Sequence, residues 1–291
     1  MRVGITILPE HSWSEAAPLW RRAEEYGFDH AWTYDHLVWG GLQDSPWFGA
    51  MPTLTAAATV TSTIRLGTFV SSPNYRHPYT FLRDLLAVED ISGGRLICGL
   101  GTGGDLDSRI LGEERPLKER VDRYHEFVEV LDRLMHEDHV DHDGEHFRTV
   151  DARTLPGAVQ RPRLPFLVAA NGPRSLRLAA RLGQGWVTYG RGGDTLEEWW
   201  SGVASLCGLL DEAEAGAERT EPLDRCLSLD GSPQFSLQSV GVFEEMVGRA
   251  AELGFTDVVT HWPRPGSPYE GSEAVLEQVA DRLDDLRSPI S

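Results

Sequence analysis

Three side chains suited to acid–base chemistry follow a single short apolar segment. Asp35, His36 and Trp39 belong to the sequence TYDHLVW at positions 33–39, and residues 29–34 predict a buried strand. A carboxylate beside an imidazole can select one ring tautomer and favour the protonated form. The pair Asp35–His36 is therefore a candidate general acid or base. The alternative is a packing histidine beside an aspartate that caps a loop.

A second candidate site is the sequence NGPR at positions 171–174, which opens a predicted helix directly after a predicted strand. Free backbone N–H groups at a helix N-terminus bind phosphate well, and Arg174 could add a bidentate contact. An ordinary capped turn between a strand and a helix is the alternative interpretation.

Two other motifs match the sequence pattern of a known type of site only in part. GLGTGG at 99–104 matches G-x-G-x-x-G, but no strand with an acidic end follows at the distance that a dinucleotide site requires. We expect these glycines to let the backbone approach a flat ligand instead. The histidines at 136, 139, 142 and 146 lack the spacing of an H-E-x-x-H site, so they predict a solvated turn and no metal.

The elements that must position these residues alternate along the chain. Strands are predicted at 2–8, 29–34, 64–70, 95–100, 166–170, 185–189, 225–229 and 256–260, and helices at 14–26, 52–62, 78–91, 117–135, 173–182, 196–213, 242–253 and 273–286. Eight strand–helix units predict a (β/α)8 TIM barrel in a single domain, 1–291, whose active site lies at the strand C-termini. An open, doubly wound sheet is the alternative.

Residues 136–165 are polar and irregular, and they separate the fourth unit from the fifth. The sequence DHDGEHF within them predicts a turn between two short strands. Insertions of this kind commonly carry function, so we expect this one at the barrel's mouth.

The composition argues against several classes of function. The net charge of −18 makes nucleic acid and anionic membranes poor partners. No apolar run approaches the roughly 18 residues of a membrane span, and the first predicted strand is too short for a signal peptide. Cys98, Cys207 and Cys226 form no close pair, which argues against disulfides or a zinc site and favours a cytoplasmic protein.

Taken together, several motifs resemble the luciferase-like monooxygenase superfamily, and within it the oxidoreductases that use the deazaflavin coenzyme F420. The motifs are TYDHLVW, IRLGTFVSSPNYRHP, DISGGRLICGLGTGG, DGEHF and FLVAANGPRSLRLAARLGQGW, and they are spread over nearly the whole chain. The resemblance implies a (β/α)8 barrel that holds the deazaflavin ring at its strand C-termini. It also implies hydride transfer between F420 and a small organic substrate. The rival interpretations are an FMN-dependent monooxygenase on the same barrel and a non-catalytic carrier of the cofactor.

The resemblance also implies roles for individual residues. His36 matches the acid or base near the reacting carbon, Asp35 a contact to the ring, and Trp39 an aromatic side chain beside the ring. The other implied cofactor contacts are Phe69, Val70, Ser72, Thr102, Gly103, Asp107, Ala170, Asn171, Gly172 and Pro173; Arg174 joins them from the phosphate argument above. The third strand is expected to end in a bulge with a cis peptide bond at Phe69–Val70, or else at Val70–Ser71.

Two departures from the resemblance leave the substrate open. The sugar-phosphate dehydrogenases of this branch have a glutamate where this chain has Gly104, and Trp39 follows one residue sooner than in that branch. We therefore do not expect a glucose-6-phosphate activity. An acidic chain must still bind an anionic cofactor tail, so we expect a local basic patch, which Arg76, Arg109, Arg174 and Arg177 could supply. The sequence is compatible with a homodimer.

Overall fold

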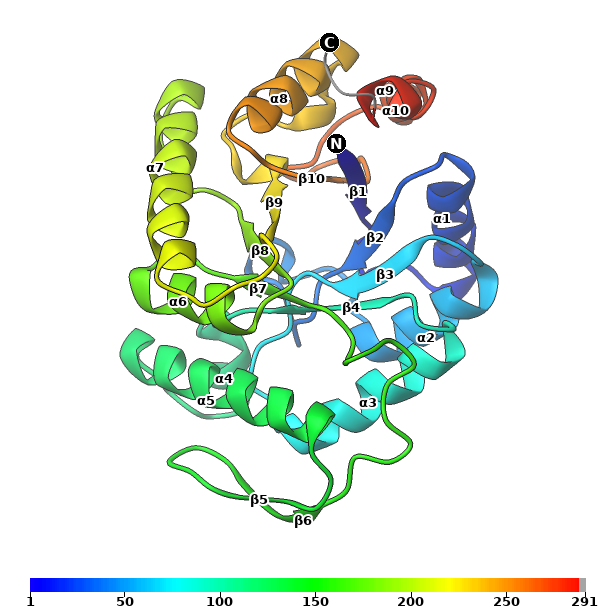
Figure 1. Ribbon diagram of the computed structural model, residues 1–291. Helices are drawn as coiled ribbons and strands as arrows, with labels where there is room; N and C mark the ends of the chain where they lie inside the picture. The colour runs from blue at the N-terminus through cyan, green and yellow to red at the C-terminus, as the bar shows by residue number, and fades with distance from the viewer. Residues whose placement is uncertain (288–291) are drawn as a thin grey trace.

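Eight parallel strands close into a barrel in the computed structural model, which describes residues 1–287 (Figure 1). The order around the barrel is β1, β10, β9, β8, β7, β4, β3 and β2, so the last strand pairs with the first. The strands are β1 (Arg2–Thr6), β2 (His30–Thr33), β3 (Arg65–Thr68), β4 (Leu96–Leu100), β7 (Phe166–Ala169), β8 (Gly185–Thr188), β9 (Asp224–Ser228) and β10 (Asp257–His261). The predicted (β/α)8 barrel is confirmed, and the open sheet is excluded.

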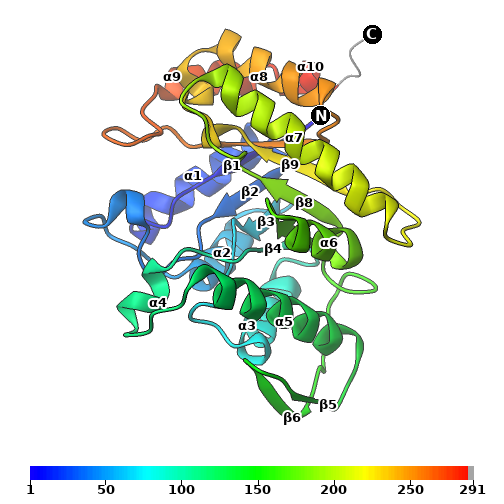
Figure 2. The ribbon, with the colours of Figure 1, turned by 90° about the vertical axis from the view of Figure 1, so that its left-hand side faces the viewer.

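Helices surround the barrel on its outside (Figures 1 and 2). They are α1 (Trp13–Glu25), α2 (Ala50–Val60), α3 (Pro78–Ile91), α4 (Leu106–Ile110), α5 (Leu117–His136), α6 (Pro173–Leu182), α7 (Leu196–Ala215), α8 (Val240–Glu252), α9 (Glu273–Ala280) and α10 (Leu283–Arg287). Within residues 1–287, none of them is both long and apolar enough to cross a lipid bilayer.

Local sequence explains where several helices begin. α3 and α6 begin at Pro78 and Pro173, a position at which the missing N–H of proline costs no hydrogen bond. The first helix begins one residue earlier than predicted, because Ser12 is its N-cap. The carboxylate of Glu15 accepts a hydrogen bond from the backbone N–H of Ser12 and completes a capping box.

The helix α4 was not predicted, and one predicted helix is divided into two. The short helix α4, between β4 and α5, was not expected, because five residues are too few to show a helical period. The predicted helix at 273–286 is two helices, α9 and α10, with a turn at 281–282. That turn contains neither glycine nor proline, so the sequence carried no stop signal there.

The insertion after α5 forms an antiparallel hairpin of β5 (Val140–Asp143) and β6 (Arg148–Ala152), so the predicted turn between two short strands is confirmed. Glu126 on α5 accepts a hydrogen bond from the backbone N–H of Phe147, whose ring lies edge-on to His77 before α3. Figures 1 and 2 show the hairpin on the outer side of α3 and α5. The insertion thus lies beside these helices, whereas the sequence analysis expected it at the barrel's mouth.

The inside of the barrel is packed with side chains. A buried cluster draws one side chain from each of five strands: Trp32, Leu167, Val187, Cys226 and Val259. Phe69 and Val70, which directly follow β3, pack against this cluster from the C-terminal end of the strands. A ligand of this barrel must therefore lie above the strand ends rather than inside the barrel.

A polar network closes the opposite, N-terminal end of the barrel beside a cavity of about 190 Å³. Asp257 accepts hydrogen bonds from Nη2 of Arg2 at 2.6 Å and from Nε2 of His30 at 3.0 Å, while the indole N–H of Trp32 donates to Nδ1 of His30 at 2.6 Å. Burial alone would raise the pKa of Asp257, but the hydrogen bonds from His30 and Arg2 outweigh it and hold the pKa well below its usual value. Polar groups at this end of a TIM barrel serve stability rather than catalysis.

Replacing Asp257 with asparagine should therefore remove a pH-dependent part of the stability. A carboxyl group has a pKa near 3.9 in the unfolded chain, so the lower folded pKa stabilises the protein fully above about pH 5, and this stabilisation is lost as the pH falls through and below about 4. We expect the difference in urea midpoint between wild type and Asp257→Asn to be large at neutral pH and to shrink on acidification. Asp224→Asn, which removes an exposed partner of the same Arg2, is the matched control and should cost much less. A difference that stays constant down to pH 3 would contradict the assignment.

Candidate active site

His36 forms a hydrogen-bonded pair with an aspartate that is far away in the sequence. Its Nδ1 lies 2.7 Å from Oδ2 of Asp107 on α4, and the other oxygen of Asp107 accepts the backbone N–H of Leu37 at 2.8 Å. Asp107 is fully buried, whereas the His36 side chain is 22% exposed. A neutral His36 therefore carries its proton on Nδ1, and its Nε2 is left with a lone pair that can accept a proton. This pair can act as a general base, or as a general acid after protonation.

Asp35 does not contact His36, which corrects the sequence interpretation of these neighbours as a pair. Both oxygens of Asp35 are engaged by Arg76 at 2.7 Å, and they also accept hydrogen bonds from the hydroxyls of Ser71 and Tyr75 at 2.5 Å. The residue is 1% exposed. Asp35 therefore holds the loop after β3 against the end of β2, and its carboxylate has little capacity left for a ligand.

Glycines keep the ends of β3 and β4 free of side chains. A Cβ atom at Gly99 would lie 1.9 Å from the carbonyl oxygen of Thr68, and one at Gly101 would lie 2.4 Å from Cγ2 of Val70. The peptide bond Phe69–Val70 is cis, as predicted. The glycines thus allow β4 to pack closely against Thr68 and Val70, and Phe69 and Val70 remain half-buried at the barrel's mouth.

The next loop contains a buried acceptor without a partner. Nδ2 of Asn74 donates to the carbonyl oxygen of Gly104 at 2.5 Å, but its Oδ1 has no hydrogen-bond partner although it is buried. Gly103, at φ +70°, leaves no room for a Cβ atom beside Asn74 and Ser72. Thr102 is half-buried in the same loop. Because buried acceptors rarely stay unpaired, this loop fits a flat ligand that brings an N–H donor.

The side chain of Asn171 is hydrogen-bonded within the protein, and its predicted contact to a ligand stays a prediction. Its Oδ1 accepts the hydroxyl of Thr188 at 2.6 Å, and its Nδ2 donates to the carbonyl oxygen of Gly190 at 2.8 Å. The side chain thus ties the loop after β7 to the loop after β8. Ala170 is buried, whereas Gly172 is exposed, with no atom within 4 Å of the position of a Cβ. Open space before the first N–H groups of α6 fits a phosphate.

The expected basic patch is only partly present. Arg76 is bound to Asp35 and is not free for an anion, whereas Arg109 is exposed and lies 3.7 Å from Asp105. Arg174 and Arg177 both line a cleft of about 720 Å³ that lies beside α6, outside the barrel. The structure therefore moves the basic surface from the barrel's mouth to its flank.

Sequence reasoning missed a second histidine–aspartate pair at the mouth. Nδ1 of His261, the last residue of β10, lies 2.8 Å from Oδ2 of Asp230, and its Nε2 lies 2.7 Å from the hydroxyl of Tyr34. The Tyr34 hydroxyl also lies 2.9 Å from that of Tyr269. Burial raises the pKa of Tyr34 well above its usual value and that of Tyr269 to about 12, so both phenols are neutral. His261 is the last residue of a strand. The search for polar side chains at strand ends, which identified His36, could also have identified His261.

This network continues into an aromatic stack that includes Trp39. The ring of Tyr269 lies parallel to His261, with centroids 3.8 Å apart, and nearly parallel to Trp39, with centroids 5.8 Å apart. Tyr34 meets Trp39 edge-on at 5.4 Å and lies edge-on to His36 at 6.2 Å. Trp39, His36 and the buried network therefore belong to one continuous cluster at the strand C-termini. Within residues 1–287, no group of three or more metal-binding side chains is arranged to hold a metal ion.

Sequence comparison relates this chain to proteins of known activity. The sequence model described as luciferase-like monooxygenase matches residues 1–222. An F420-dependent glucose-6-phosphate dehydrogenase of Amycolatopsis mediterranei is 30% identical over 90% of this chain and 83% of that protein. A 5,10-methylenetetrahydromethanopterin reductase of Archaeoglobus fulgidus is 32% identical over 189 residues, which cover 64% of this chain and 52% of that protein.

Solved structures share the fold over the whole chain. An F420-dependent secondary alcohol dehydrogenase in complex with an F420–acetone adduct superimposes with a TM-score of 0.77, at 17% identity and 99% coverage of both chains. A monooxygenase from Streptomyces bottropensis gives the same TM-score at 23% identity, covering 99% of this chain and 100% of the other. At such identities the likeness shows the barrel and no more.

Proposed function

The chain belongs to the luciferase-like monooxygenase family, and on that premise we propose that it is an oxidoreductase that transfers a hydride between coenzyme F420 and a small organic substrate. Relatives named as F420-dependent dehydrogenases support the choice of cofactor. The observation that carries the proposal is the His36–Asp107 pair, with one imidazole nitrogen unoccupied at the strand C-termini.

The residues at the mouth fit the parts of this cofactor. When bound, the deazaflavin supplies a ring carbon that accepts or donates a hydride. The unpaired Oδ1 of Asn74 suits an N–H group on such a ring, and the half-buried Phe69 and Val70 after β3 suit its flat face. The open helix N-terminus at Gly172 suits its phosphate.

His36 is proposed to handle the proton that accompanies the hydride. When an alcohol is oxidised, Nε2 of His36 accepts the hydroxyl proton, so that a neutral carbonyl product forms. Asp107 holds the opposite N–H and stabilises the imidazolium that results. In the reverse direction the same nitrogen returns the proton to the substrate oxygen. A positioned acid–base group of this kind is worth about 10²–10⁴ in rate.

The second candidate function is an FMN-dependent monooxygenase, which the description of the family as luciferase-like monooxygenase favours. Fluorescence titration of the purified chain with F420 and, in parallel, with FMN distinguishes the two. We expect saturable binding of F420 that is tighter than that of FMN. A chain that binds only FMN, and consumes oxygen when a flavin reductase is added, would overturn the proposal. The paired histidine argues against a third interpretation, a carrier without catalysis.

The substrate is proposed as a small molecule with a hydroxyl or carbonyl group. Glucose-6-phosphate is a substrate in the names of several relatives, but the resemblance to that branch implies a glutamate where this chain has Gly104. The adjacent Asp105 is exposed and lies 3.7 Å from Arg109, so it does not replace the missing carboxylate. A panel of alcohols and ketones is therefore the appropriate screen.

Tyr269 should affect the substrate more than the cofactor if Trp39 borders the substrate. Tyr269→Ala removes both the stack beside Trp39 and the hydrogen bond to Tyr34, and aromatic pairs are worth about 0.5–1.5 kcal/mol. We expect KM for the substrate to rise by about two- to tenfold, with F420 affinity unchanged. Tyr269→Phe keeps the stack and serves as the matched control. Equal KM values for wild type and Tyr269→Ala would show that the stack does not shape the substrate site.

A further inference from the structure

The loops at the barrel's mouth divide into two sides of different chemistry. The features proposed for the cofactor, at Asn74, Gly103 and Gly172, follow β3, β4 and β7. These strands are neighbours in the barrel, in the order β7, β4, β3. The other strands, β2, β1, β10, β9 and β8, are also consecutive, so the loops that follow them form the opposite side of the mouth.

Aromatic rings gather on this opposite side, which we call the aromatic side. They come from the loops after four of its strands and include Tyr34, Trp39, Tyr189, Phe235 and Tyr269. The ring of Tyr269 connects two of these loops to its own, because its centroid lies 5.8 Å from that of Trp39 and 6.2 Å from that of Phe235. Ligand sites are lined mainly by apolar and aromatic side chains with a few polar groups among them.

Trp39 presents a ring that the protein holds in place. One contact is the nearly parallel ring of Tyr269. Gly41 lies close to the ring as well, because a Cβ atom at that position would be 2.6 Å from Cη2 of Trp39. Trp39 itself is only half-buried. A ring that is already fixed loses little conformational entropy when a ligand packs on it.

Tyr189 extends the aromatic side to the loop after β8. Its side chain is 63% exposed, and its backbone is fixed because the indole N–H of Trp199 donates to its carbonyl oxygen at 3.0 Å. Gly231, in the loop after β9, lies beside it, since a Cβ atom there would be 2.7 Å from that of Tyr189. A large ring exposed at the edge of a mouth is available to a ligand.

The polar atoms behind these rings are already paired with one another. Asp230 accepts the backbone N–H groups of Ser236 and His261 at 2.9 and 2.8 Å, and its Oδ2 also lies 2.8 Å from Nδ1 of His261. The hydroxyls of Tyr34 and Tyr269 bond to each other, and that of Tyr34 also bonds to His261. The aromatic side therefore offers a ligand the faces of its rings.

Positive charge on the aromatic side is scarce and already engaged. Its loops contain two arginines, Arg191 and Arg264, and no lysine. Arg264 donates to Glu10 at 2.6 Å, while Arg191 donates to the carbonyl oxygen of Asn171, on the cofactor's side of the mouth. A phosphate or carboxylate on the substrate would therefore gain little there.

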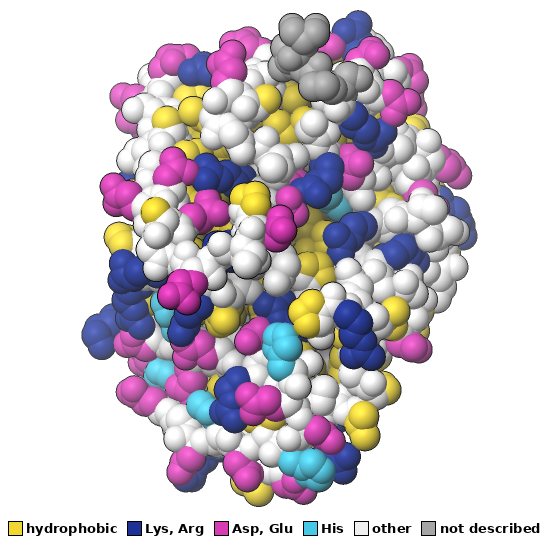
Figure 3. Space-filling model, viewed as in Figure 1, with side chains coloured by type: hydrophobic (Ala, Val, Ile, Leu, Met, Phe, Trp, Pro, Cys, Tyr) yellow, Lys and Arg dark blue, Asp and Glu magenta, His cyan; other side chains and the backbone are white. Residues whose placement is uncertain are grey.

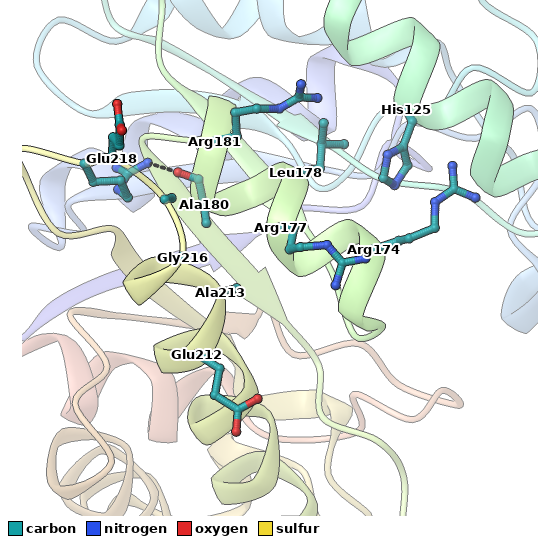
Figure 4. A pocket seen from close by; sticks show the side chains of 12 residues that line it. His125, Arg174, Arg177, Leu178, Ala180, Arg181, Glu212, Ala213, Gly216 and Glu218 are labelled. Atoms are coloured by element: carbon teal, nitrogen blue, oxygen red, sulfur yellow. Dashed lines mark hydrogen bonds between the residues drawn. The ribbon is translucent and has the colours of Figure 1, made fainter.

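Basic side chains gather on the flank of the barrel instead. Figure 4 shows Arg174, Arg177 and Arg181 on α6, outside the barrel. In Figure 3 basic side chains cluster at the left edge, where α6 and the lower end of α7 lie in Figure 1. The chain thus separates its basic surface from the aromatic side.

His36 lies where the two sides of the mouth meet. It follows β2, which pairs with β3 of the cofactor's side, and its Nδ1 is bound to Asp107 on the helix after β4. The ring of Tyr34 is edge-on to both His36 and Trp39. A substrate whose oxygen lies at Nε2 of His36 therefore directs the group beside its reacting carbon toward Trp39.

We propose that the aromatic side selects an uncharged substrate in which an aryl ring is attached to the carbon that bears the hydroxyl or carbonyl group. The inference rests on the proposed function, because it takes the substrate oxygen to lie at Nε2 of His36. The aryl ring packs on Trp39, which already stacks on Tyr269 and, behind it, on His261. An aromatic contact of this kind favours an aryl over a saturated ring by about two- to tenfold.

The test compares kcat/KM for 1-phenylethanol and 1-cyclohexylethanol, which have the same carbon skeleton, with the F420-loaded chain. Oxidation to the ketone sends the C–H hydride to F420 and the hydroxyl proton to His36. We expect the wild type to prefer the aryl alcohol by about two- to tenfold. It should also use 1-phenylethanol better than 4-(1-hydroxyethyl)benzoate, which adds a carboxylate to the same ring.

Variants locate the preference on the aromatic side. Trp39→Leu should bring the ratio of the two kcat/KM values close to one. Tyr189→Leu removes an exposed ring and should lower the ratio by a smaller factor, so it serves as a second variant if Trp39→Leu fails to fold. Tyr79→Leu makes the same change on α3 and should keep the ratio of the wild type. A general loss of activity affects both alcohols equally and leaves the ratio unchanged.

The outcomes separate this inference from the proposed function, since F420 binding is measured independently by fluorescence. A wild type that uses both alcohols equally well, prefers the cyclohexyl alcohol or the benzoate, or binds F420 and oxidises neither alcohol would overturn the aryl selection alone. A preference that persists in both Trp39→Leu and Tyr189→Leu, or that Tyr79→Leu abolishes, would overturn its assignment to the aromatic side. A chain that does not bind F420 would overturn the proposed function and this inference with it.

Discussion

Alanine in place of His36 should lower kcat by about 10²–10⁴ while the affinity for F420 stays near that of the wild type. The reason is that Nε2 of His36 is the proposed proton acceptor, whereas the ring surface and phosphate site are built by other loops. The measurement is steady-state turnover with a substrate from the alcohol and ketone panel, beside a fluorescence titration of each variant. Undiminished turnover would remove His36 from the mechanism.

Two controls separate proton transfer from structural damage at His36. Added imidazole should restore part of the turnover of His36→Ala, because the deleted ring leaves space beside Asp107. Asp107→Asn keeps the size of the side chain but removes the charge that stabilises the imidazolium, so turnover should fall by less than in His36→Ala. If imidazole has no effect and both variants lose F420 binding, the loss is one of folding.

The sequence was sufficient for the architecture because strong local signals repeated along the chain. Most barrel strands are short and rich in apolar or β-branched residues, and several are followed by a helix with a recognisable start, such as Pro78 or Pro173. The failures concern elements without such signals. α4 has only five residues, and the turn between α9 and α10 lacks both glycine and proline.

The position of His36 was predictable, but its partner was not. Asp35 is adjacent in sequence, yet successive side chains of an extended segment point to opposite sides. The actual partner, Asp107, is 71 residues away, on a helix that the sequence did not reveal. Contacts of this kind depend on how two loops meet above the barrel.

The Asp230–His261–Tyr34 network was hidden for a similar reason. Tyr34 and His261 are 227 residues apart, and they meet because β1 pairs with both β2 and β10 when the barrel closes. The position of His261 at the end of a predicted strand was a usable signal. Its contact with Tyr34 required the closed order of the strands.

Asp35→Asn should cause the largest loss of stability among the substitutions considered. The Arg76 guanidinium is 14% exposed and Asp35 is 1% exposed, so the mutation leaves a largely buried cation without its bidentate partner. Breaking a buried ion pair from one side costs about 3–5 kcal/mol. In a chain of this size, 1 kcal/mol corresponds to about 2–4 °C in Tm. We therefore expect Tm to fall by about 6–20 °C.

Denaturant unfolding of single and double variants tests whether the charge imbalance causes this loss. Arg76→Met removes the cation. The double variant Asp35→Asn/Arg76→Met should therefore lose less free energy of unfolding than the two single variants lose together. Asp143→Asn, which breaks an exposed pair with Arg148 on the hairpin, should leave the midpoint unchanged. If the two losses at positions 35 and 76 simply add, the pair is not coupled. Asp35 would then stabilise the loop after β3 through Ser71 and Tyr75, whose hydroxyls donate to the same carboxylate.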